Sequence, residues 1–68
     1  MGFETVMLSV VKDVARNSRA TFMNGSLFVI KVDAEEANRI LTNLKHFARC
    51  DVQMTRNKVT GEYAYDFV

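Results

Sequence analysis

His46 and Cys50 come closest, by type and spacing, to forming a chemical site in this chain. They lie four positions apart, which places them on one face of a helix, and both side chains can bind zinc. A zinc site needs three or four protein ligands, but the chain has one histidine and one cysteine, with only Asp51 nearby. No third group completes a Cys–His nucleophile either. We expect no metal and no cofactor, and we interpret Cys50 as a half-buried structural thiol.

The charged residues have structural explanations that compete with catalytic ones. Glu35 and Glu36 follow Asp33 in the pattern of a helix capping box, so they are not candidates for acid–base chemistry. Four basic residues fall near the ends of two predicted helices, where they complement the helix dipole; the alternative is a pair of phosphate contacts, made by Lys12, Arg16, Lys45 and Arg49. With three glycines the chain has no glycine-rich phosphate loop. The sequence therefore predicts neither an enzyme nor a small-molecule substrate.

Composition narrows the class of protein. The 68 residues form one domain (1–68), and the formal net charge of +1 is lower than is usual for proteins that hold nucleic acid by its phosphates. A single cysteine excludes a disulfide within the chain and is typical of a reducing compartment, so we predict a cytoplasmic protein. No apolar run approaches the roughly 18 residues of a membrane span, and we predict no membrane association.

Two helices and two hairpins are predicted from the apolar pattern. Steps of three and four between apolar residues predict helices over residues 3–16 and 34–49. Asn24-Gly25, a favoured type I′ turn, joins predicted strands at 20–23 and 27–32. A second hairpin is predicted to pair residues 51–56 with 63–67.

The order of these elements repeats. At an offset of 33 residues, "VKDVAR" from Val11 aligns with "LKHFAR" from Leu44. Two α-β-β units, 3–32 and 36–68, would explain this, although amphipathic helices can also agree by chance. Placing the two most apolar strands in the centre gives an antiparallel sheet of order 1-2-4-3 with both helices on one face. The predicted fold is therefore α+β and resembles the ferredoxin-like arrangement with its chain ends moved.

The predicted interaction site is the sheet face opposite the helices. Directing Phe28 and Ile30 toward the helices leaves an outer face of Leu27, Val29, Lys31, Ala64, Asp66 and Val68, in which Lys31 pairs with Asp66. An uncovered apolar patch predicts a non-enzymatic binding or regulatory protein, acting as a homodimer or on a protein partner. Small regulators encoded by phages or mobile elements fit this description.

An alternative function is binding of single-stranded nucleic acid on the same face. Gly25, Phe28 and Val29 fit the spacing of the strand motif in RNA-recognition domains, whose central strands carry base-stacking aromatic residues. Asn24, Ser26 and Lys31 depart from that motif. Arg19, Lys31 and Arg56 would supply the positive charge.

Overall fold

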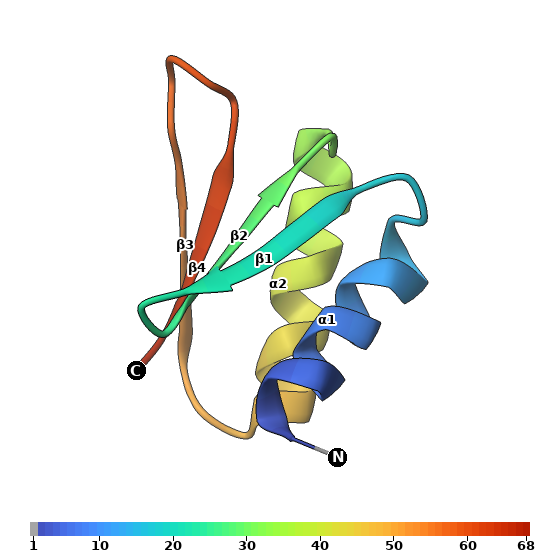
Figure 1. Cartoon of the computed structure of the whole chain (residues 1–68), viewed down its shortest axis with the longest axis vertical. Coiled ribbons are helices and arrows are strands. Elements are labelled where there is room, and N and C mark those ends of the chain that lie inside the picture. The colour runs from blue at the N-terminus through green and yellow to red at the C-terminus, as the bar shows by residue number, and fades with distance from the viewer. Residues whose placement is uncertain (1) are drawn as a thin grey trace.

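The computed structural model describes residues 2–68 and shows two helices beside a four-stranded antiparallel sheet (Figure 1). The helices are α1 (Phe3–Val14) and α2 (Ala34–Ala48), and the strands are β1 (Arg19–Met23), β2 (Ser26–Ile30), β3 (Val52–Arg56) and β4 (Tyr63–Phe67). The sheet order is β1-β2-β4-β3, so the predicted α+β fold and strand order are confirmed. Within residues 2–68, neither helix combines the length and apolar character needed to cross a bilayer.

Different local contacts fix the start of α2 and the end of α1. The Asp33 carboxylate accepts a hydrogen bond from the Glu36 backbone N–H at 2.8 Å, and the Glu36 carboxylate accepts one from the Asp33 N–H at 3.1 Å. This is the predicted capping box of α2. Helix α1 ends at Val14, two residues earlier than predicted. Beyond it, Ser18 is buried and its hydroxyl donates to the Ala15 carbonyl at 2.7 Å, which fixes the turn into β1.

Positive backbone φ angles set the ends of β2. Asn24 and Gly25 have φ values of 53° and 81°, as a type I′ turn requires, and this two-residue turn pairs Met23 with Ser26. Lys31 has a φ of 63°, which ends the strand at Ile30. The predicted strand extending to residue 32 is therefore two residues too long.

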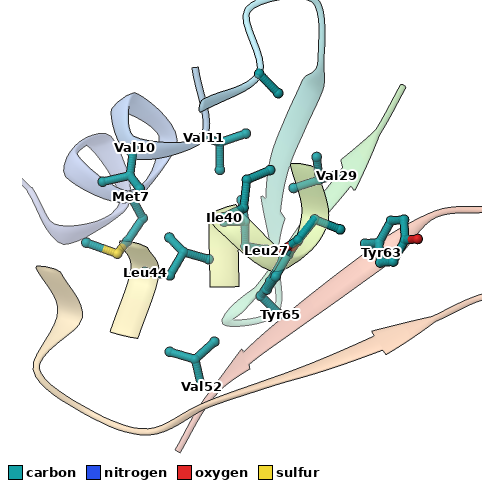
Figure 2. Close-up of a cluster of buried hydrophobic side chains, with 12 residues drawn as sticks. Met7, Val10, Val11, Leu27, Val29, Ile40, Leu44, Val52, Tyr63 and Tyr65 are labelled. Carbon is teal, nitrogen blue, oxygen red and sulfur yellow. The ribbon is translucent and has the colours of Figure 1, made fainter. Parts of the chain in front are cut away.

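The core lies between the sheet and the two antiparallel helices, which cover one face of the sheet side by side (Figure 1). Figure 2 shows Leu27, Val29 and Tyr65 directed toward α2, where they meet Ile40 and Leu44. The Tyr65 hydroxyl donates to the Ala37 carbonyl at 2.8 Å, so a buried hydrogen bond ties β4 to the first turns of α2. Such a contact satisfies a polar group that would otherwise be costly to bury.

Three phenylalanine rings pack together at one end of the molecule. Phe3 of α1 lies edge-on to Phe67 and Phe22, with ring centroids 5.2 and 6.4 Å apart. Phe22 and Phe67 stack at 5.9 Å. Aromatic pairs of this kind contribute about 0.5–1.5 kcal/mol beyond the area they bury, so they help to hold the start of α1 against β1 and β4.

Candidate binding face on the sheet

The sheet has one face toward the helices and one open face. Along β2 the buried residues are Leu27 and Val29, whereas Ile30 is 37% exposed and Phe28 is half-buried. Strand β1 alternates in the same way, with Met23 55% exposed. The open face is therefore the one that presents Phe28 and Ile30.

The predicted orientation of β2, with Phe28 and Ile30 toward the helices, was wrong. Leu27 and Val29, expected on the outer face, are fully buried in the core, and Phe28 and Ile30 point away from the helices. The alternation of β2 could not decide its faces, because four consecutive residues of the strand are apolar. The register decides them: Leu27 pairs with Tyr65, and adjacent paired residues share a face.

The remaining predicted face residues fall in three different situations. Ala64 and Asp66 lie on β4 in register with Phe28 and Ser26, so they belong to the open face. Lys31 lies beyond the end of β2 and is exposed, and Val68 follows β4 and is also exposed. The predicted pairing of Lys31 with Asp66 is replaced, because the Asp66 carboxylate accepts a hydrogen bond from the Ser26 hydroxyl.

Strand register arranges the open face in three rows that run across the sheet. The first row contains Arg19, Ile30 and Glu62. The middle row contains Thr21, Phe28, Ala64 and Thr55. The third row contains Met23, Ser26, Asp66 and Gln53.

A hollow of about 270 Å³ lies over β1 and β2 on this face. Phe28 and Ile30 line it, Arg19 and Glu62 flank it at one end, and Met23 lies at the other. Arg19 carries a positive charge and Glu62 a negative one, on opposite sides of Ile30. The face thus has an apolar centre with charged and polar groups around it, which is the composition of many protein-binding surfaces.

Sequence reasoning missed the large apolar residues of the open face, Met23, Phe28 and Ile30, although the sequence held a signal for them. Thr21 alternates with Ala20 and Phe22 in β1, which marks the inner side of that strand. A two-residue Asn-Gly turn pairs Phe22 with Leu27. Applying that register would have turned Leu27 inward.

The basic residues near the helix ends do not form one site. Helices α1 and α2 are antiparallel, so Lys12 and Arg16 lie at the opposite end of the molecule from Lys45 and Arg49 (Figure 1). The Lys12 ammonium donates to the Ser18 carbonyl. The Lys45 ammonium lies 4.0 Å from an Asp51 carboxylate oxygen.

His46 and Cys50 are both exposed, and the expectation of a half-buried Cys50 was wrong. The helix ends at Ala48, and Arg49 adopts a left-handed conformation with a φ of 56°, so Cys50 lies outside the helix that carries His46. Among residues 2–68, no group of three or more histidine, cysteine or acidic residues is placed to hold a metal ion.

A second hollow, of about 340 Å³, runs along the outside of α1. Its lining comes from this helix alone, over residues 5–13, so it reflects the relief of a single helix surface.

A comparison of this chain with protein families, curated proteins and solved structures finds no match.

Proposed function

We propose that this chain is a non-enzymatic, cytoplasmic binding protein that docks a protein partner on the open face of its sheet. The observation that carries the proposal is the position of Phe28 and Ile30. Both lie on β2, one of the two central strands, on the side opposite α1 and α2. Large apolar groups in the middle of a solvent-facing sheet are typical of interaction surfaces.

The surroundings of these residues support a protein as the partner. Polar side chains border the apolar centre, and the rim carries both Arg19 and Glu62. Protein interfaces combine a centre depleted of charge with a polar rim, and the rim charges set orientation more than affinity. A small regulator or inhibitor, of the kind that phages and mobile elements encode, remains the class that we favour.

Single-stranded nucleic acid is the second candidate, because Phe28 faces outward on the strand where RNA-recognition domains carry stacking residues. The charges of the face oppose it. Arg19 is the basic residue of the three rows, whereas Glu62 and Asp66 are both acidic. Two carboxylates beside one guanidinium would repel a phosphate backbone.

Site-specific photo-crosslinking in the producing cells tests the proposal. A benzophenone amino acid replaces Thr21, which is exposed beside the hollow, or Arg39, which is exposed on α2. We expect protein adducts of discrete mass from position 21 and none of these from position 39. The proposal fails if position 21 gives no specific adducts. Adducts that nuclease treatment removes would also overturn it and would favour the nucleic-acid alternative.

A further inference from the structure

We propose that the partner on the open face is a second copy of this chain, with two sheets packed face to face around a twofold axis parallel to the strands. This inference rests on the proposed function, since it names the occupant of the same face. What supports it is how the three rows of side chains meet their own copies.

Such an axis, passing between β2 and β4, reverses the order of the strands in the partner sheet. It keeps each row opposite the same row of the partner. Strand β2 then lies over the partner's β4, and β1 lies over the partner's β3. Facing sheets pack about 10 Å apart, so side chains from the two open faces would fill the space between them.

The middle row is complementary in size. Phe28 and Ala64 are directly paired neighbours within one sheet, on β2 and β4. Under the twofold axis, Phe28 lies opposite the partner's Ala64, and Ala64 lies opposite the partner's Phe28. A large ring therefore meets a small side chain twice, which lets the two faces interdigitate.

The first row contains an opposite-charge pair. Arg19 is on β1, and Glu62 is next to Tyr63, the first residue of β4. The axis brings Arg19 to within one strand spacing, about 4.8 Å to the side, of the partner's Glu62. Both side chains are long enough to close that gap, and the pair forms twice. The same axis also brings Glu62 to one strand spacing from the partner's Glu62, and Asp66 to one strand spacing from the partner's Asp66. These two like-charge contacts offset the two opposite-charge pairs, so the charges of the face alone do not drive association.

A twofold axis perpendicular to the strands lacks these matches. It would place the first row over the partner's third row, with Glu62 opposite the partner's Asp66. Two like charges would then face each other at each of two positions, which disfavours that arrangement. The parallel axis puts no like charges directly opposite each other and adds two opposite-charge pairs, so the charges favour it over the perpendicular one.

The size of the open face indicates how tightly two copies would associate. Four strands of five residues cover a footprint of about 19 Å by about 17 Å, or roughly 300 Å². Stable complexes commonly bury about 800 Å² of accessible surface on each partner. The face is much smaller than this, so we expect a weak, transient dimer that forms only at high micromolar concentrations.

A charge-swap experiment on the purified protein tests the arrangement, with sedimentation equilibrium from about 1 µM to about 1 mM to span the expected range. Arg19→Glu and Glu62→Arg should each weaken dimerisation about tenfold or more, because each places like charges together. The double variant should recover most of the loss by reversing the pair. Arg39→Glu, on α2, makes the same charge change away from the face and should leave dimerisation unchanged. Circular dichroism of each variant separates loss of association from loss of fold.

The outcomes distinguish this inference from the proposed function. A parent protein that stays monomeric to about 1 mM overturns self-association, and crosslinks from position 21 to a different protein would then leave the proposed function standing. Failure of the double variant to recover, with both single variants folded, overturns the twofold arrangement. A monomeric protein without crosslinks from position 21 overturns both proposals.

Discussion

Leu27 and Ile30 lie on opposite faces of β2, and alanine at either position removes three carbon atoms. Leu27 is completely buried, whereas Ile30 is 37% exposed. At about 0.8 kcal/mol per carbon, burial of the removed atoms accounts for about 2.4 kcal/mol at Leu27, and a cavity among well-packed neighbours adds to this. Leu27→Ala should therefore cost about 3–4 kcal/mol. Ile30→Ala removes partly hydrated atoms and leaves no enclosed cavity, so it should cost about 1 kcal/mol.

The loss of stability in Leu27→Ala is a large fraction of the total because the domain is small. A core of this size supplies about 3–5 kcal/mol of net stability, so Leu27→Ala should leave the chain close to its unfolding midpoint at room temperature. Urea denaturation followed by circular dichroism measures both variants. Repeating it over a tenfold range of protein concentration separates folding from any contribution of association. An Ile30→Ala variant that loses as much stability as Leu27→Ala would refute the assignment of the two faces.

Two further contacts give measurable expectations. Tyr65→Phe should cost about 0.5–1.5 kcal/mol in urea denaturation, because it removes the hydrogen bond to the Ala37 carbonyl. Burial, with a smaller effect of Tyr63, also raises the pKa of Tyr65 above its usual range, so the Tyr65 contribution should hold up to about pH 10 and fall at higher pH; a Tyr65→Phe variant with the same alkaline loss as the parent would contradict this. Asp33→Ala should cost about 0.5–2 kcal/mol by opening the capping box. Asp13→Ala removes an exposed carboxylate outside that box and serves as its control; equal losses would argue against the cap.

The elements were predictable because their signals are local. The capping box at Asp33 and the apolar steps of three and four marked α2 before any packing was known. Asn24-Gly25 marked the first hairpin. The strand order followed from one further consideration, that the most apolar strands belong in the centre of the sheet. The two-unit origin of the chain, 3–32 and 36–68, stays a prediction.

The faces of β2 were harder to predict because they depend on pairing. A run of four apolar residues satisfies the core in either orientation, so only its partners can choose between them. The neighbouring strand β4 alternates more clearly, and Ala64 and Asp66 were correctly placed on the face opposite the helices. Lys31 added to the error, because a left-handed residue ends the strand where the pattern suggested that it continued.

The apolar run of β2, residues 27–30, also supports a binding role for the open face, because folding requires only half of it. A central strand needs one apolar face to build this core, and Leu27 and Val29 provide it. The fold would tolerate polar residues at the two outward positions of the run, as it does at Thr21 and Thr55 on the edge strands. Phe28 and Ile30 instead add apolar surface that folding of one chain leaves in contact with water. That surface lies at the centre of the sheet, away from both edges, where a second sheet can cover it most completely.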